Sequence, residues 1–271
     1  MNLKHISIKG THNLRDLGGF PVEGGGTCWN ILYRSDSLHS LSEGEWKALE
    51  ERNLKSIIDL RSLPEVRAKA ITPPTSIKYY HFSLMKNLDD IPALGAATMA
   101  DIQRVGVEKI MESMKLDYIK TIRQNPETCV AVLDCISEGL KEGAVLFLCS
   151  AGKDRTGIVA ALLLDLAGVS EEDIVADYAV SAIYNAKGIN RMVENLPEEL
   201  NRHMPPEAGT MLKHVFDSKP ETMKRFLDAL HGVSNGEGNG EREPSLWNVL
   251  KEHGFTDEKK ETLRQQIIES F

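Results

Sequence analysis

The 271-residue sequence predicts an α/β fold in which helices flank a central, mostly parallel sheet. Short apolar segments alternate along the chain with segments of helical pattern, the order of elements that builds a parallel sheet. The apolar run Ala144–Leu148 leads through a polar loop into a second apolar run, 158–166, as a buried strand leads into a helix. Because the length lies at the upper end for a single domain, we expect residues 1–271 to form one domain.

The individual elements follow in order. Glycines at 24–26 mark a turn before the apolar segment 28–33. Ser42 and Glu45 form a capping box that predicts a helix over 42–52, and Ser170 is expected to cap a helix after the polar loop. The other expected segments are strands at 54–60 and 77–82, a helix at 128–140, a helical C-terminal part over about 205–271 with helices at 207–217, 221–231 and 257–270, and a solvated loop at 232–244.

The most informative segment is the loop 149–157, Cys-Ser-Ala-Gly-Lys-Asp-Arg-Thr-Gly. Between a strand and a helix, such a loop aims free N–H groups and the positive end of the helix dipole at one point, which favours an anion. Gly152 permits a conformation that strains other residues, and Arg155 offers a planar fork for two phosphate oxygens. We therefore expect a phosphate pocket with Cys149 at its floor, lined by Ser150, Ala151, Gly152, Lys153 and Asp154.

Cys149 is expected to act as a nucleophile. The same donors favour its thiolate, which would attack phosphorus in line and carry a covalent cysteinyl-phosphate. Arg155 and the amides would hold the equatorial oxygens, and the Thr156 hydroxyl would hydrogen-bond the sulfur as it leaves. Two alternatives are a plain buried core cysteine and a nucleotide-binding P-loop. The second fails, because Phe147 stands where that motif needs glycine.

Further motifs accompany this loop: 13–19, 33–38, 57–62 with Glu65, 168–170, 177–181 and 254–267. Together they resemble the atypical bacterial protein tyrosine/serine phosphatases, Cys-x5-Arg phosphatases whose members include dual phosphoprotein and phosphoinositide phosphatases. The matching blocks span nearly the whole chain. The resemblance implies a cysteine-phosphatase-like fold, a phosphorylated protein or phosphoinositide as substrate, and no cofactor.

Two positions of the loop region bear on rate and on substrate. Members of that family usually carry His immediately before the nucleophile, where this chain has Leu148. Cys149 then relies on the amides, Arg155 and the helix end. Phosphoinositide phosphatases carry Lys at the place of Lys153, which implies a wider positive site for a second phosphate. In the alternative, Lys153 pairs with Asp154 at the rim.

The proton for the leaving oxygen is expected to come from Asp59. The resemblance implies a general acid in this Asp-Leu-Arg segment, and the predicted strand 54–60 ends at the same sheet edge as Cys149. In the alternative, Asp59 caps the next turn or holds Arg61 or Arg155 in an ion pair. The remaining candidates for the acid are Asp89, Asp90 and Asp101.

The segment over about 85–125 carries apolar residues at helical spacing, such as Ile110, Met114 and Ile122. Such a stripe belongs more often to a plain core than to a special surface. The resemblance nevertheless implies a helical lid over the active site here, and the methionines of this segment would suit an adaptable apolar surface. We expect a lid, with core packing as the alternative.

The composition of the chain limits which kinds of molecule it is expected to bind. The net charge of −8, from 40 acidic and 32 basic residues, opposes nucleic-acid binding. The sequence holds no apolar run of 18 residues and no signal peptide at its start, so we expect no membrane segment and a cytoplasmic protein, with export by another route left open. The cysteines show no zinc-type pairing, and no metal is expected.

Two other function classes remain open from the sequence. A sulfurtransferase also places a reactive cysteine in a strand-to-helix loop, but it has less need of the Arg-Thr-Gly ending. A pseudophosphatase would bind phosphorylated partners without turnover, and Leu148 gives this alternative some weight. The sequence favours the active phosphatase, because nucleophile, arginine and candidate acid are all present. It indicates no oligomeric state.

Overall fold

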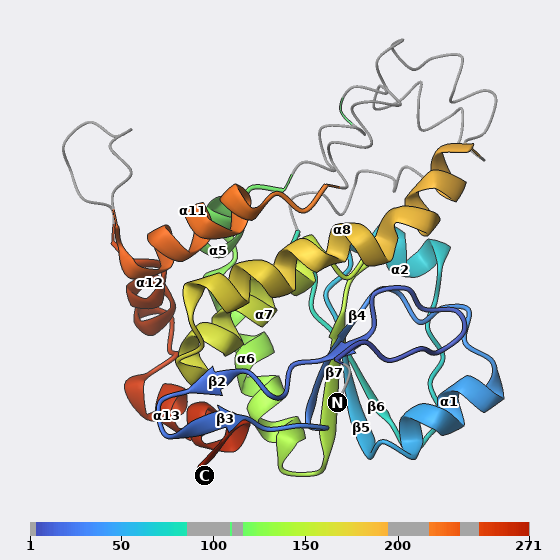
Figure 1. Ribbon diagram of the computed structural model, residues 1–271, viewed down its shortest axis with the longest axis horizontal. Helices are drawn as coiled ribbons and strands as arrows, with labels where there is room; N and C mark the ends of the chain where they lie inside the picture. The colour runs from blue at the N-terminus through green and yellow to red at the C-terminus, as the bar shows by residue number, and fades with distance from the viewer. Residues whose placement is uncertain (1–3, 86–108, 110–115, 195–216, 234–243, 271) are drawn as a thin grey trace.

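The computed structural model describes residues 4–85, 109, 116–194, 217–233 and 244–270 (Figure 1). The strands of the main sheet are β1 (Arg15–Asp16), β4 (Leu32–Ser35), β5 (Leu54–Asp59), β6 (Lys78–His81) and β7 (Ala144–Leu148). They lie in the order β1-β4-β7-β5-β6. All neighbours pair in parallel except β1, which is antiparallel to β4. The predicted α/β fold with a mostly parallel sheet is confirmed.

Helices pack on both faces of this sheet. They are α1 (Glu43–Glu50), α2 (Leu63–Ala68), α5 (Tyr118–Gln124), α6 (Pro126–Leu140), α7 (Asp154–Ala167), α8 (Glu171–Glu194), α11 (Pro220–His231), α12 (Leu246–Glu252) and α13 (Asp257–Ile267). Figure 1 shows α1 on one side of the strands and α6, α7 and α8 on the other. Each side has its own apolar core. Because successive strand residues face opposite sides, Phe147 and Cys149 belong to the larger core with α7, and Leu148 belongs to the smaller core.

A second, antiparallel sheet of three strands lies apart from the first. It consists of β2 (Pro21–Val22), β3 (Gly25–Thr27) and β8 (Ile268–Ser270), in that order. β2 and β3 form a hairpin at the turn that the glycines predicted. The prediction of a helix over 257–270 is wrong at its end, because α13 stops at Ile267 and β8 follows. Pairing with the open edge of β3 outweighs the local helix propensity there.

Other element boundaries follow local signals. The predicted capping box of Ser42 and Glu45 begins α1, and the Ser170 hydroxyl accepts the Asp173 N–H at the start of α8. In the apolar segment 28–33 a strand starts only at Leu32, because Asn30 adopts a left-handed conformation with φ of 63°. Such a residue interrupts an extended strand.

Several predicted features fall outside the described residues. These are most of the expected lid (86–108 and 110–115), the expected helix over 207–216, and 234–243 of the solvated loop. The described end of the lid segment is α5, whose Tyr118 and Ile122 are buried in the larger core. That end is therefore core packing. In the described part of the chain, no helix is long and apolar enough to cross a membrane.

Candidate active site

Cys149 is the first residue after β7, and the loop that follows it leads into α7 at Asp154. The position at the carboxyl end of a central parallel strand is where α/β folds place ligands. The Cys149 side chain is 2% exposed, and Arg155 and Arg34 both lie within electrostatic reach of its sulfur. The structure thus brings the predicted nucleophile and the predicted arginine together.

Carbonyl groups of the loop accept hydrogen bonds from the surrounding structure and from the start of α7. Ser150 O accepts the Ser37 N–H (3.2 Å), and Ala151 O accepts the Asn13 and Asn185 amides (2.9 and 2.8 Å). Gly152 O accepts the Asn13 amide and the Arg34 guanidinium (2.9 Å each). Lys153 O accepts the Gly157 N–H (2.7 Å). Donors from β4 and the residues after it, from the N-terminal segment and from α8 therefore hold three consecutive carbonyls, and the fourth, Lys153 O, bonds within the first turn of α7.

The N–H groups of the loop consequently point the opposite way. In a trans peptide the C=O and the next N–H point in opposite directions, and the described chain has no cis bond. The N–H groups of Ala151, Gly152, Asp154, Arg155 and Thr156 donate to no acceptor within the described residues. The Thr156 hydroxyl is also buried without a partner in that part of the chain. The loop is a concave set of donors, the arrangement that binds anions.

Gly152 is required by this geometry. Its φ is +63°, and a Cβ at this position would lie 2.5 Å from the Ser35 carbonyl carbon, so any side chain would meet backbone. Gly157 allows a different close approach, because its Cβ would lie 3.2 Å from the Tyr178 ring of α8. The two glycines let the loop pack against β4 and the loop helix pack against α8.

Arg155 is held by Glu65, the third residue of α2. Its guanidinium donates to both carboxylate oxygens, with an Nη2–Oε1 distance of 2.8 Å. The Ser150 hydroxyl donates to the same carboxylate. Burial alone would raise the pKa of Glu65, but Arg155 and Ser150 more than offset this and hold the pKa well below its usual range. These contacts use two of the five N–H donors of Arg155 and leave three for an oxyanion.

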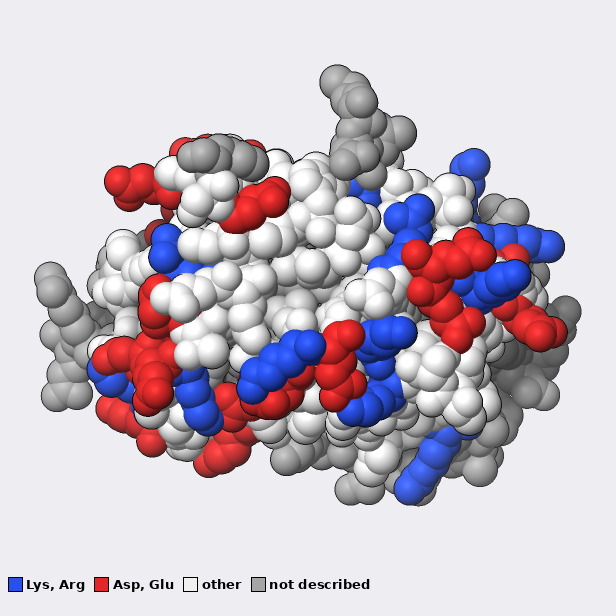
Figure 2. All heavy atoms as spheres, turned by 90° about the horizontal axis from the view of Figure 1, so that it is seen from below, with Lys and Arg blue, Asp and Glu red and all other residues white. Residues whose placement is uncertain are grey.

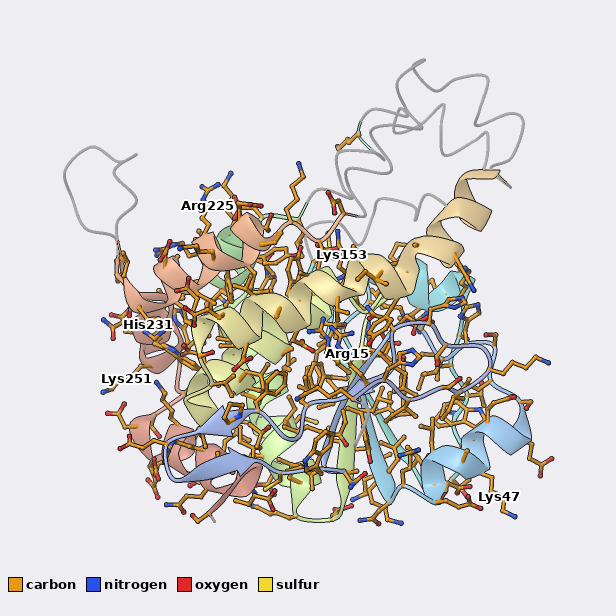
Figure 3. All side chains as sticks on the ribbon, viewed as in Figure 1. Arg15, Lys47, Lys153, Arg225, His231 and Lys251 are labelled. Atoms are coloured by element: carbon orange, nitrogen blue, oxygen red, sulfur yellow. The ribbon has the colours of Figure 1, made fainter. Side chains whose placement is uncertain are left out.

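A buried ion cluster lies beneath the loop. Asp177 of α8 accepts Arg15 Nε at 2.8 Å and Arg34 Nη1 at 2.5 Å. Burial would raise the pKa of Asp177, and the two arginines instead lower it to about 2. Figure 3 shows Arg15 in the middle of the molecule beside α8, whereas Lys47 and Lys251 lie at its periphery. Through Arg34 this cluster fixes the loop carbonyl of Gly152.

Asp59 lies at the predicted sheet edge, where its carboxylate is paired with Arg61. Its carboxylate is fully buried and accepts Arg61 Nε and Nη2 (2.9 and 2.6 Å), the Arg61 N–H (3.0 Å) and the Tyr79 hydroxyl (2.7 Å). Asp59 is paired with Leu148 across the sheet, so it faces the smaller core, opposite to Cys149. This is the alternative in which Asp59 holds Arg61. Asp89, Asp90 and Asp101 lie outside the described residues.

Lys153 and Asp154 pair with each other at the loop. The Lys153 ammonium lies 3.3 Å from the Asp154 carboxylate, and its side chain is 3% exposed. It also donates to Asp217 O at 3.0 Å. On its other side Asp154 accepts the Tyr118 hydroxyl, which also contacts the Tyr178 hydroxyl at 2.8 Å. The alternative predicted for Lys153, pairing with Asp154, is the one that the structure shows.

The tyrosine phosphatase family matches residues 6–269 of this sequence. The chain belongs to the tyrosine phosphatase family. A tyrosine-protein phosphatase of Nostoc commune is 35% identical over 155 residues, which are 57% of this chain and 49% of that relative, so the match spans about half of its length. A protein of Cupriavidus necator named as a tyrosine-protein phosphatase is 29% identical over 82% of this chain and 81% of its own. The triple specificity protein phosphatase PtpB of Mycobacterium tuberculosis is 39% identical over 26% of this chain and 25% of its own.

Membership of the tyrosine phosphatase family, whose members are phosphoric monoester hydrolases, confirms the resemblance predicted from the sequence. Sequence reasoning did not assign roles to Glu65, Asn13 and Asn185. Glu65 carried one usable signal, the Ser62-to-Glu65 capping box that begins α2. The two asparagines carried none by themselves, because their amides reach the loop carbonyls only after the chain has folded.

Proposed function

We propose that this member of the tyrosine phosphatase family hydrolyses phosphate monoesters, with phosphotyrosine in proteins as the principal substrate class, through a cysteinyl-phosphate on Cys149. The orientation of the loop carries this proposal. Three loop carbonyls are bonded by surrounding elements, and the loop N–H groups that follow Cys149 have no acceptor in the described residues. An oxyanion of matching size satisfies such a set. A phosphoryl group has three equatorial oxygens to fill it.

The reaction has two balanced steps. The Cys149 thiolate attacks phosphorus, so the S–P bond forms and the bond to the ester oxygen breaks, and that oxygen takes a proton from solvent water as it leaves. Water then attacks phosphorus, the S–P bond breaks, and inorganic phosphate and the thiolate are released. The loop amides and the remaining N–H donors of Arg155 hold the equatorial oxygens in both steps. The Thr156 hydroxyl, buried without a partner in the described residues, donates to the sulfur as it leaves.

For Asp59 we propose a positioning role. Both oxygens of its carboxylate are occupied by Arg61 and Tyr79, and a general acid must reach the leaving oxygen within about 3 Å or through one water. Arg61 in turn donates to the Ser37 hydroxyl at 3.2 Å. Since the Ser37 N–H holds the loop carbonyl of Ser150, Asp59 acts on the loop through Arg61.

The wider substrate range is a further part of the proposal. One relative is named a triple specificity protein phosphatase, and we propose phosphoserine, phosphothreonine and phosphoinositides as secondary substrates here. The pairing of Lys153 with Asp154 makes a lysine-bound second phosphate the weakest of these. The face drawn in Figure 2 intersperses basic and acidic side chains among its described residues. The thiolate chemistry fits a reducing compartment such as the cytoplasm.

The test is turnover of an aryl phosphate in the presence of a metal chelator. We expect wild-type protein and the matched control Cys135→Ser to release phosphate equally, and Cys149→Ser to release none above background. Vanadate, which mimics the phosphorane, should inhibit the two active proteins. Binding of the substrate without turnover by wild-type protein would support the pseudophosphatase instead, and thiocyanate formation from thiosulfate and cyanide would support a sulfurtransferase.

A further inference from the structure

The ion cluster beneath the loop carries an excess positive charge. Arg15 and Arg34 both pair with the single carboxylate of Asp177, and the side chains of all three are at most 3% exposed. Two buried cations against one anion leave a net charge of +1. A buried charge is costly unless a partner of opposite sign balances it. A negatively charged group near the cluster is therefore needed to balance its excess positive charge.

The register of the sheet places Arg34 and Cys149 on the same face. Arg34 is opposite Phe147 in the parallel pair of β4 and β7, and Phe147 and Cys149 share a face because they are two residues apart. Diagonal neighbours of this kind lie roughly 7–8 Å apart between their Cα atoms, within reach of a long side chain. The Arg34 side chain does turn toward the loop, since its Nη2 donates to Gly152 O at 2.9 Å.

Arg34 also retains an unused donor. Its Nη atoms serve Asp177, Gly152 and Lys153, but its Nε–H is buried without a hydrogen-bond partner in the described residues. Burial and the nearby Arg15 lower the pKa of Arg34 to about 10, so it remains a cation at neutral pH. Arg34 and Cys149 lie within electrostatic reach of each other.

Other charged groups around Cys149 have ion-pair or hydrogen-bond partners of their own. From α7 and α2, Arg155 pairs with Glu65, and within the loop Lys153 pairs with Asp154. Arg61 pairs with Asp59 on the opposite face of the sheet. The oxygens of Asp36 accept the His12 and Asn13 N–H groups. The hydroxyls of Tyr118 and Tyr178, near Asp154, are neutral. Among these groups, the Arg15–Asp177–Arg34 cluster is the one with more cations than anions. Lys4, which has Asp16 and Asp173 as further carboxylate neighbours, also lies within electrostatic reach of Arg15 and Asp177.

We infer that Arg34 is the cation that stabilises the Cys149 thiolate from beneath the loop, through the excess positive charge that it shares with Arg15 and Asp177. The residue before the nucleophile, Leu148, carries no charge that could do so. Arg155, whose charge Glu65 matches, is then left to hold the phosphoryl oxygens. This inference rests on the proposed function, because it assigns the source of the thiolate that the reaction needs. Arg34 does not touch the substrate and is a positioning residue.

The test is the pH profile of Cys149 alkylation by iodoacetamide, measured by mass spectrometry of the Cys149 peptide. This readout needs no turnover, so it fails or succeeds independently of the phosphatase activity. Burial raises the pKa of Cys129 to about 12 and that of Cys135 to about 11, so these thiols react slowly in the range used. Arg34→Gln and Arg34→Lys both lose the guanidinium fork, but only Arg34→Gln loses the charge. Asp177→Asn removes the opposing charge with little change in shape.

We expect the midpoint of the profile to move up by about one pH unit or more in Arg34→Gln, to move by less than half of that in Arg34→Lys, and to move down in Asp177→Asn. A purely structural role would impair all three proteins without shifts of opposite sign. Equal upward shifts in Arg34→Gln and Arg34→Lys would overturn the inference. If Arg34→Gln does not fold, Asp177→Asn decides alone: an unchanged or raised midpoint overturns the proposal.

Discussion

Removal of the Glu65 charge tests how the loop arginine is positioned. In Glu65→Gln, one of the two oxygens that accept Arg155 becomes an NH2 group, which faces the guanidinium with donors of its own. A hydrogen bond to a charged group contributes about 1.5–3 kcal/mol. If the whole loss appears in the transition state, kcat/KM should fall about 10- to 150-fold, since each 1.36 kcal/mol corresponds to about a factor of ten.

Glu45→Gln is the matched control. Glu45 occupies the same third position in the capping box of α1, where it accepts the Ser42 N–H at 2.8 Å and pairs with no arginine among the described residues. Both variants weaken a helix cap, but only Glu65→Gln releases the loop arginine. We expect kcat/KM of Glu45→Gln to stay within about twofold of wild type, since a surface cap contributes only to stability.

The pH dependence gives the assay a second readout. Because the pKa of Glu65 is held well below its ordinary value of about 4.3, its contribution to the free energy of unfolding is fully present above that ordinary value and is lost as pH falls below it. The difference in unfolding free energy between wild type and Glu65→Gln should therefore be constant from about pH 5 to about pH 8. It should shrink as the pH falls below the ordinary pKa of a glutamate. The reasoning is refuted if Glu65→Gln keeps the kcat/KM of Glu45→Gln.

Three further predictions concern the loop and its supports. Gly152→Ala should abolish turnover and lower the free energy of unfolding by about 1–3 kcal/mol more than Gly168→Ala does. Both glycines have positive φ, but of the two only Gly152 has backbone atoms where a Cβ would lie. Equal melting temperatures for the two variants would contradict this. Asp59→Asn should lower kcat/KM by the same factor for aryl phosphates of high and low leaving-group pKa, whereas a loss confined to poor leaving groups would restore Asp59 as the acid. Thr156→Val should slow the second step without lowering the melting temperature, because the hydroxyl is buried without a partner in the described residues. In rapid-quench kinetics the first-turnover burst should persist while kcat falls. An unchanged kcat would exclude a role of this hydroxyl in releasing the sulfur.

The strand, the loop and the loop helix were predictable because their signals are local. An apolar run, a glycine-containing turn and a second apolar run fix β7 and α7 from the sequence alone. The position of Asp59 was predictable to the correct sheet edge. Its orientation was not, because that depends on the register with Leu148, and a shift of one residue reverses the face of a strand side chain.

The supports of the loop depend on contacts that are distant in the chain. Glu65 has a local function as a helix cap, and its contacts with Ser150 and Arg155 join residues 85 and 90 positions apart. The same holds for the Asn13 amide, which is 138 residues from Ala151. No periodicity or spacing reports such contacts, so only the folded chain shows how the carbonyls of the loop are held.

Detection of the covalent intermediate tests the central claim most directly. Wild-type protein is mixed with an aryl phosphate, quenched in acid within the first turnover and digested, and the peptides are analysed by mass spectrometry. The account predicts one phosphoryl group on the peptide that contains Cys149, in an amount equal to the burst of released phenol. Turnover with no phosphoryl group on Cys149, or with the group on another residue, would contradict it.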